Sequence, residues 1–209
     1  MIINFDQLVQ KFNLNIKGVI HVGAHVGQEY DAYKKHGITK IAWFEPVPTT
    51  YQKLVKNLPV GSMTYNVALG NEEGVKEMFI ETVNQGMSSS LLEPGTHLKT
   101  YPNITFDSKQ TIQIKRLDSY QFPISWFNMM NMDVQGYELE VLKGSINTLK
   151  HIDIIYTEIN TEDVYKDCVH VDQLDEFLGA RGFERVFTQM ACKSWGDALY
   201  LKKKNHGRN

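Results

Sequence analysis

Cysteine is scarce in this sequence of 209 residues, which contains only Cys168 and Cys192. Neither has a Cys-x-x-Cys partner or a nearby histidine pairing, so a disulfide scaffold is not expected and two free thiols indicate a reducing compartment. Long apolar runs are absent too, since no segment approaches the ~18 residues of a membrane span. The N-terminal residues also lack the basic and then apolar stretch of a signal peptide. These absences predict a cytoplasmic protein with no membrane span and no cleaved leader.

An excess of charge of one sign is also lacking. Lysine and arginine number 22 against 24 aspartate and glutamate residues, which gives a formal net charge of -2 at pH 7. A nucleic-acid-binding domain would carry a basic excess, so nucleic acid is disfavoured as a partner. With no repeat, linker or low-complexity segment, the length fits a single domain over 1–209. Within it we expect a helical lead over 1–17 and a solvated, frayed tail over 203–209.

Short β-branched or aromatic runs alternate with amphipathic stretches along the chain. This alternation is typical of βαβ units around a parallel sheet and predicts an α/β fold. The final two runs, 183–188 and 197–202, are joined by a loop short enough for an antiparallel hairpin at the edge of the sheet. The other expected strands are 18–22, 40–45, 63–67, 75–80, 111–115, 128–133 and 153–160, and the expected helices are 6–12, 26–36, 49–58, 137–149 and 171–182.

A long segment over 81–110, which contains serine, glycine and proline, separates the alternating runs 75–80 and 111–115. Unstructured segments of this length inside a compact domain are usually functional or mobile. We therefore predict that 81–110 forms a lid over a substrate site or a wall of it, an acceptor loop if the reaction is a group transfer.

The first expected strand leads into Gly-Ala-His-Val-Gly, which places Gly23 and Gly27 in a turn before a helix. Glycines let the backbone approach a ligand closely, and helix N-terminal amides favour an anionic group. Glu45 ends the second strand, where a carboxylate can accept both hydroxyl hydrogens of a ribose. Together these features favour an adenosine-containing cofactor. NAD fits less well, because His25 and Gln28 break its G-x-G-x-x-G fingerprint, whereas S-adenosylmethionine has no pyrophosphate to accommodate.

A set of short segments, spread along the chain in a fixed order, carries a more specific signal. They are HVGAHVGQE (21–29), WFEPVPTTYQKL (43–54), NVALG (66–70), SSSLL (88–92), IKRLDSY (114–120), MDVQGYELEVLKGS (132–145), IYTEIN (155–160) and GDALYLKK (196–203). In these segments the chain resembles the FkbM-type family of S-adenosylmethionine-dependent O-methyltransferases. The resemblance implies a class I methyltransferase (Rossmann-like) sheet, mostly parallel with an antiparallel C-terminal strand and with helices on both faces. It also implies S-adenosyl-L-methionine as the cofactor.

The resemblance also implies where that cofactor binds. The glycine turn would surround its methionine part, Glu45 would bind its ribose, and 66–68 would border its adenine. The cofactor-binding residues implied in this way are His21, Gly23, Ala24, His25, Gly27, Glu45, Pro46, Asn66, Val67, Ala68, Ser89, Asp133 and Val134. This chain departs from the family pattern at His21, where Asp is usual, and at His25, where Asn is usual.

Two acids, Asp133 and Glu158, end adjacent expected strands. Neighbouring strands lie ~4.8 Å apart, so the two carboxylates can share a proton or an Mg²⁺ ion. A sugar hydroxyl is a weak nucleophile at neutral pH and needs a base or a metal to take its proton. Asp133 and Glu158 are therefore the candidate catalytic residues and the candidate metal ligands. In the alternative interpretation, Asp133 only orients the cofactor and Glu158 caps a loop.

The resemblance and the weak net charge together suggest methyl transfer to a hydroxyl of a sugar, in a glycan or a glycosylated small molecule. Trp195 is the aromatic residue that we expect to stack on the sugar ring. One alternative is a ribose 2'-O-methyltransferase of RNA, which would combine Asp133 with paired lysines that the sequence does not place. The other is a non-catalytic module that retains only the cofactor pocket, and the departures at His21 and His25 motivate it.

Overall fold

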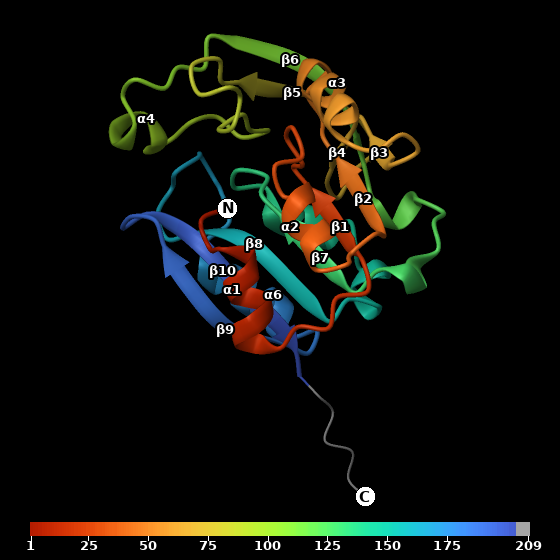
Figure 1. The fold of residues 1–209 in the computed structure, drawn as a ribbon. Coiled ribbons are helices and arrows are strands. Elements are labelled where there is room, and N and C mark those ends of the chain that lie inside the picture. Colours follow the sequence, from red (N-terminus) through yellow and green to blue (C-terminus); the bar gives the residue numbers. More distant parts are fainter. Residues whose placement is uncertain (204–209) are drawn as a thin grey trace, which may run out of the picture.

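A seven-stranded sheet with the order β3-β2-β1-β7-β8-β10-β9 forms the centre of the protein (Figure 1). The computed structural model describes residues 1–203, so the frayed tail expected over 203–209 lies outside the described residues except for Lys203. The first five strands in this order, β3, β2, β1, β7 and β8, run parallel to one another, whereas β10 pairs antiparallel with both β8 and β9. The predicted α/β fold and terminal hairpin are therefore confirmed. The strands of this sheet are β1 (Val19–Val22), β2 (Ile41–Phe44), β3 (Met63–Tyr65), β7 (Met129–Met132), β8 (Ile154–Asn160), β9 (Phe183–Met190) and β10 (Trp195–Lys202).

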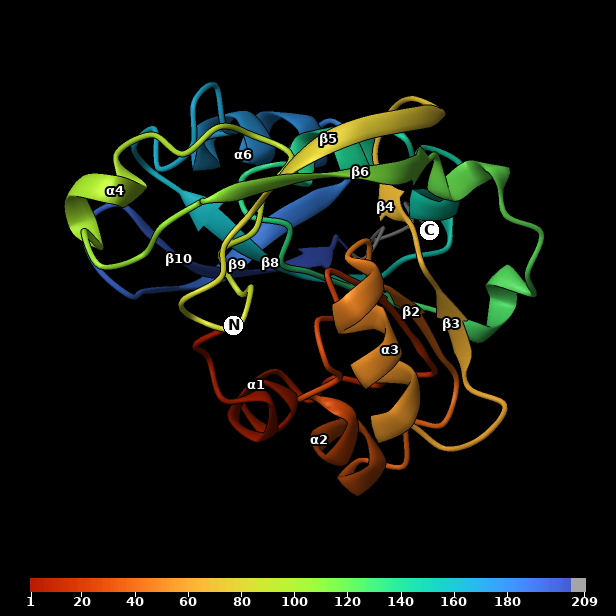
Figure 2. The same cartoon turned by 90° about the horizontal axis from the view of Figure 1, so that it is seen from above.

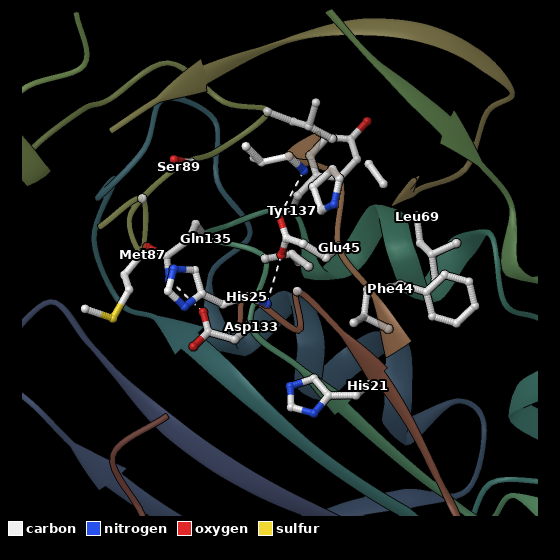
Figure 3. Close-up of a pocket in the computed structure, with 18 of the residues that line it drawn as sticks. His21, His25, Phe44, Glu45, Leu69, Met87, Ser89, Asp133, Gln135 and Tyr137 are labelled. Atoms are coloured by element: carbon white, nitrogen blue, oxygen red, sulfur yellow. Dashed lines mark hydrogen bonds between the residues drawn. The ribbon is translucent and has the colours of Figure 1, made fainter. Parts of the chain in front are cut away.

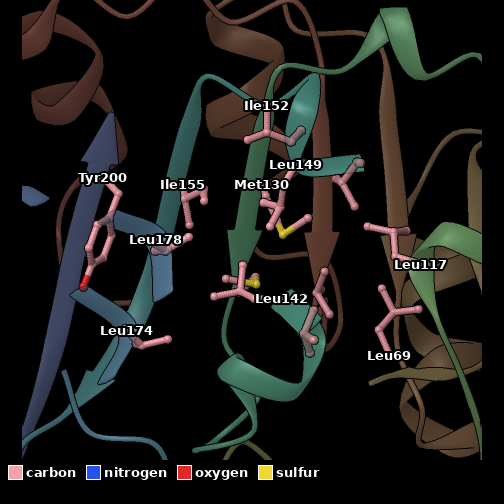
Figure 4. Close-up of a cluster of buried hydrophobic side chains, with 14 of the residues drawn as sticks. Leu69, Leu117, Met130, Leu142, Leu149, Ile152, Ile155, Leu174, Leu178 and Tyr200 are labelled. Carbon is pink, nitrogen blue, oxygen red and sulfur yellow. The ribbon is translucent and has the colours of Figure 1, made fainter. Parts of the chain in front are cut away.

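Helices cover both faces of this sheet. Successive side chains of its central strands point to opposite faces and are buried against these two sets of helices. Val19 and Met129 pack into a core with α1, α2 and α3. Ile20 and Met130 pack into the other core with α5 and α6 (Figure 4). Strands buried on both faces consist almost entirely of apolar residues, as these do. The helices on the two faces are α1 (Phe5–Phe12), α2 (Tyr30–Lys35), α3 (Pro48–Asn57), α5 (Glu138–Lys143) and α6 (Val171–Gly179), with 3-10 helices η1 (Leu117–Ser119), η2 (Ile124–Trp126) and η3 (Thr148–Lys150) in the connections.

A small second sheet lies at the ends of β1 and β2 (Figures 1 and 2). It consists of β4 (Ala68–Leu69), β5 (Gly74–Ile80) and β6 (Ser108–Lys115) in the order β4-β6-β5. β6 pairs parallel with β4 and antiparallel with β5. The strands expected at 75–80 and 111–115 are therefore present, but they leave the main sheet and form a roof over its carboxyl-terminal edge.

Three of the expected helices are shorter in the structure, and the one expected over 171–182 ends at Gly179. The helix expected over 26–36 begins only at Tyr30, because the residues before it form the turn that follows β1. The helix expected over 137–149 ends at Lys143. There Gly144 packs so closely on Gly70 that a Cβ would lie 1.9 Å from its carbonyl oxygen, and the chain turns away.

Segment 81–110 contains more regular structure than its composition indicates. Ser90 pairs with Phe79 of β5 through an isolated β-bridge, the short helix α4 (His97–Thr100) follows, and β6 begins within its last residues. Within residues 1–203, no helix has the length and apolar character needed to cross a membrane.

Candidate active site

The turn after β1 brings its backbone against the ends of two other strands. Gly23 has a φ of +78°, and a Cβ at this position would lie 1.9 Å from the carbonyl oxygen of Asp133. Only glycine combines this left-handed conformation with so close an approach. The amides of Gly23 and Ala24 both donate to the carbonyl of Phe44 at 3.0 Å. The turn is therefore fixed to the end of β2 and packed on the end of β7.

Glu45 follows β2 and holds the same turn with its side chain (Figure 3). Its Oε2 accepts the His25 amide and its Oε1 accepts the Val47 amide, each at 2.9 Å. Burial raises the pKa of this carboxyl to about 7, although the two amide donors oppose the shift. Each oxygen retains a second lone pair, and Glu45 lines a cavity, so it can still accept hydrogen bonds from a ligand.

This first cavity lies between the ends of β1, β2 and β7 and the small sheet (Figure 3). It contains about 910 Å³ of empty space, part of it open to solvent. Its wall combines apolar side chains with a small number of polar groups, as ligand pockets usually do. The predicted cofactor-binding residues that line it are His21, Gly23, His25, Glu45, Pro46, Val67, Ala68, Ser89, Asp133 and Val134.

Three other predicted cofactor-binding residues lie beside this cavity rather than on its wall. Ala24 is buried in the core with α2 and α3. A Cβ at Gly27 would lie 2.9 Å from a side-chain carbon of α3, so this glycine lets α3 approach the turn. Asn66 is exposed, and its Nδ2 donates to the carbonyls of Glu45 and Pro46 at 2.9 Å. These residues support the backbone that forms the wall.

His21 lies on the cavity wall and belongs to a buried polar network. Asn131 Nδ2 donates to the Tyr33 hydroxyl at 2.6 Å, so this hydroxyl donates in turn to His21 Nδ1 at 3.0 Å. Burial lowers the pKa of His21, and the proton of the neutral ring is therefore on Nε2, 3.9 Å from Glu29 Oε2. Where the family usually has a carboxylate, this chain presents an N–H donor.

The loop after β7 joins the two predicted catalytic acids through one amide group. Gln135 Nε2 donates to Asp133 Oδ1 at 2.6 Å and to Glu158 Oε2 of β8 at 2.9 Å. Gln135 is itself fixed, because the Tyr165 hydroxyl donates to its Oε1 at 2.7 Å and Ser90 Oγ donates to its carbonyl at 2.8 Å. The structure thus brings both acids together. Gln135 was not among the predicted site residues, although it lies inside one of the family-like segments.

The ionisation of Glu158 differs from that of an exposed glutamate. Burial raises its pKa well above the ordinary value, and the nearby carboxylates of Asp133 and Glu138 add to the effect. Once deprotonated, such a carboxylate is a stronger base than an exposed one. Burial also raises the pKa of Glu138 to about 7. Its Oε1 accepts the amides of Val134 and Gly136 at 3.1 and 3.3 Å, which holds the loop after β7 in place.

A second cavity opens beside the first and shares Asp133 and Gln135 with it. Glu158 lines the second cavity and not the first. Another part of its wall is aromatic, where Trp195 Nε1 donates to the Tyr101 hydroxyl at 3.0 Å. The aromatic residue expected to meet a sugar therefore lines this second cavity.

Segment 81–110 contributes to both cavities. Gly86, Ser89 and Leu91 line the first, Met87 lines both, and the residues of this segment that line the second are Asn84, Ser88, His97, Tyr101 and Ile104. The segment thus lies beside both cavities, and its role as a lid or wall of an acceptor site stays a prediction.

The donor set at Asp133 and Glu158 does not fit Mg²⁺. Both carboxylates accept hydrogen bonds from Gln135, and Asp133 Oδ2 lies 3.2 Å from the ammonium nitrogen of Met1. The raised pKa of Glu158 favours its protonated form, whereas Mg²⁺ prefers ionised carboxylates and further oxygen ligands. Among residues 1–203, the one trio of possible metal ligands that lie close together is found in a separate groove and consists of Asp163, Cys168 and His170.

The sheet order, the glycine turn and the acid after β2 define a class I methyltransferase, a class whose cofactor is S-adenosylmethionine. More specifically, the chain belongs to the FkbM family. Its residues 21–185 match the family model described as "Methyltransferase FkbM domain". The family that the segments resembled is therefore confirmed.

Known proteins are similar to this chain in sequence or in fold. The chain is 29% identical over 133 residues to the 2-O-methyltransferase NoeI of Sinorhizobium fredii (strain NBRC 101917 / NGR234). That match covers 59% of this chain and 54% of NoeI, so the chain spans about half the length of this curated relative.

Two solved structures share the fold at low sequence identity. Magnesium protoporphyrin IX methyltransferase from Synechocystis PCC 6803, with bound S-adenosylmethionine, has a TM-score of 0.54 at 10% identity and covers 95% of this chain and 76% of its own. A protein of the NADB-Rossmann superfamily from Streptococcus agalactiae has a TM-score of 0.52 at 14% identity, over 97% of this chain and 69% of its own. These two likenesses show the fold alone.

Proposed function

We propose that the protein transfers the methyl group of S-adenosylmethionine to a hydroxyl of a sugar, in a glycan or in a glycosylated metabolite. The observation that carries this proposal is the junction of two cavities at Asp133 and Gln135, with Glu158 on the wall of the second. A methyltransferase needs a donor site, an acceptor site and a proton acceptor where they meet. The relative named 2-O-methyltransferase supports oxygen as the accepting atom.

The first cavity offers a matching group for each part of the cofactor. Glu45 would accept the ribose hydroxyls, and Asp133 would attract the positive charge of the sulfonium and ammonium groups. His21 Nε2–H would donate a hydrogen bond to the cofactor carboxylate. Leu69 and Met78 supply apolar wall for the adenine.

When bound, the cofactor supplies a methyl group on a cationic sulfur, and the acceptor oxygen forms its C–O bond in line as the C–S bond breaks. Glu158 takes the proton that the hydroxyl loses, so the products are a methyl ether, a thioether and a protonated carboxyl. Gln135 holds this carboxylate in place through its hydrogen bond of 2.9 Å. Because burial raises its pKa, Glu158 must first lose its own proton, and once it has done so it is a stronger base than an exposed glutamate.

RNA ribose methylation is less well supported by the acceptor side of the site. Within the described residues, the second cavity is lined by two acids and by no lysine or arginine. Binding an RNA backbone requires positive charge, so a tight and salt-sensitive gel shift would be needed to favour this alternative.

Calorimetry with S-adenosylmethionine and S-adenosylhomocysteine, followed by transfer of labelled methyl to a panel of mono- and oligosaccharides, tests the proposal. We expect binding of both compounds and label in at least one saccharide. Glu158→Gln should bind the cofactor and lose transfer, while Glu184→Gln, at an exposed position on β9, should keep both. No binding at high micromolar cofactor would contradict the proposal. Binding without transfer to any acceptor would favour the non-catalytic module.

A further inference from the structure

The second cavity contains acidic side chains but no basic ones. Asp133 and Glu158 line it, and within residues 1–203 no lysine or arginine does. His97, also on its wall, stays neutral because burial lowers its pKa. The ammonium group of Met1 lies at the boundary of both cavities and pairs with Asp133 at 3.2 Å. The wall therefore presents no unpaired positive charge to a ligand.

The environment of Glu158 disfavours a negative charge beside the second cavity. Glu158 is 4% exposed, and this burial opposes the ionisation of its carboxyl first, with the neighbouring carboxylates of Asp133 and Glu138 adding to the effect. A phosphate placed beside it would add further negative charge to the same space. Phosphate sites in proteins often use arginine or lysine, and the described residues that line the second cavity include neither.

The rest of the wall suits a neutral ring that carries hydroxyl groups. Trp195 and Tyr101 are held together by their hydrogen bond, and aromatic rings pack well against the apolar C–H face of a sugar. His97 packs on Tyr101 and Tyr165 with ring centroids 5.2 and 5.6 Å apart. Its Nδ1 is buried without a hydrogen-bond partner, which leaves Nε2 as the ring nitrogen that can bind a hydroxyl.

We propose that the second cavity binds an uncharged sugar that is already in glycosidic linkage, and that it rejects sugar phosphates and nucleotide-activated sugars. This inference rests on the proposed function, because it assigns the acceptor of that reaction. An activated sugar carries its phosphate on the anomeric oxygen, which belongs to the same ring as the hydroxyls that could be methylated. The phosphate would therefore enter the acidic cavity together with the ring. A glycosyl-transfer reaction must then supply the substrate before the methyl group is added.

The test compares matched forms of the same sugars with the full chain and labelled S-adenosylmethionine. For fucose, rhamnose, galactose, mannose and N-acetylglucosamine, the methyl glycoside is set against the 1-phosphate and the nucleotide diphosphate sugar. We expect kcat/KM for the accepted glycoside to exceed that of its phosphorylated forms by about tenfold or more, since like charges disfavour binding. Equal or faster methylation of a phosphorylated form would overturn this inference and leave the proposed function intact. Cofactor binding without transfer to any sugar would overturn both.

A pair of lysine variants isolates the electrostatic cause. Asn84 is exposed and lines the second cavity, whereas its neighbour Val83 is 58% exposed and lines neither cavity. Asn84→Lys should raise kcat/KM for a sugar 1-phosphate by about tenfold over Val83→Lys, which has the same net charge. This gain should shrink at high salt. Equal activity of the two variants toward the phosphate would contradict an exclusion based on charge.

Discussion

The two cavities are built from different kinds of contact. The residues of the first are held in place by backbone contacts at the ends of parallel strands, through the close approach at Gly23 and the amides that donate to Glu45. The second is assembled from side chains far apart in the sequence, with Tyr101 before β6, Glu158 in β8 and Trp195 in β10. A site that backbone contacts hold in place depends on the fold itself, which suits a cofactor that stays the same whatever the substrate is. A site made of side chains can change its specificity without disturbing the sheet.

The largest effect is expected where the backbone of the first cavity is changed. Gly23→Ala places a Cβ 1.9 Å from the Asp133 carbonyl oxygen at a positive φ, so we expect a loss of about 3 kcal/mol or more in stability. Calorimetric binding of S-adenosylhomocysteine should be lost with it. Gly37→Ala is the matched control, because Gly37 has a φ of +71° but nothing within 4 Å of an added Cβ. Equal behaviour of the two variants would show that the close approach is unimportant.

Glu45 should make the stability of the first cavity depend on pH. Its pKa rises from 4.5 to about 7 on folding, so the folded state binds this proton more tightly than the unfolded chain does. Its contribution to the free energy of unfolding is complete below pH 4.5 and is lost as pH rises through about 7. At ~1.36 kcal/mol for each unit of pKa, this effect amounts to up to about 3 kcal/mol. Urea unfolding of Glu45→Gln should therefore show a smaller loss of stability between about pH 5 and about pH 8. The same pH dependence in the variant and in the unmodified protein would contradict this.

A smaller effect is expected at the junction of the two cavities. Gln135→Leu removes the donor shared by Asp133 and Glu158, so the pKa of Glu158 should rise further. We expect kcat to fall by about 10- to 100-fold and the rising limb of its pH profile to move to higher pH. Affinity for the cofactor should change much less than kcat. Gln189→Leu, at an exposed position on β9, is the control, and an unshifted pH profile in Gln135→Leu would argue against the positioning role.

The smallest effect is expected on the aromatic wall of the second cavity. Tyr101→Phe removes the acceptor of the Trp195 N–H and keeps the ring, so KM for the sugar should rise by about two- to tenfold, which corresponds to one hydrogen bond. The dissociation constant of the cofactor should not change. Tyr51→Phe removes a hydroxyl that bonds Thr64 away from both cavities and serves as the control. An equal change in both constants would show that the two cavities are not separate in function.

The arrangement of residues around the first cavity was predictable because its signals are local. Strands such as β1 and β7 are buried on both faces and therefore appear as short apolar runs, and the turn at Gly23 follows directly from such a run. Glu45 and His25 follow the neighbouring parallel strands β2 and β1. Because parallel strands end at the same edge of the sheet, the two residues meet there.

The contacts that form the second cavity and the second sheet were not predictable in the same way. Trp195 and Tyr101 meet across 94 positions, and neither has a local pattern that indicates the other. The contact between Gln135 and Glu158 depends on the pairing of β7 with β8 and on a positive φ of +56° at Gln135, which no residue pattern specifies. The second sheet likewise forms through long-range pairing of β4, β5 and β6.

A crystal structure with S-adenosylhomocysteine is the most direct test that the two cavities are two halves of one active site. We expect the ribose hydroxyls to lie within hydrogen-bond distance of the Glu45 carboxylate. The sulfur should lie beside Asp133 and Gln135 and face the second cavity, which contains Glu158. Adenosine bound elsewhere, or a sulfur atom that faces away from the second cavity, would contradict this arrangement.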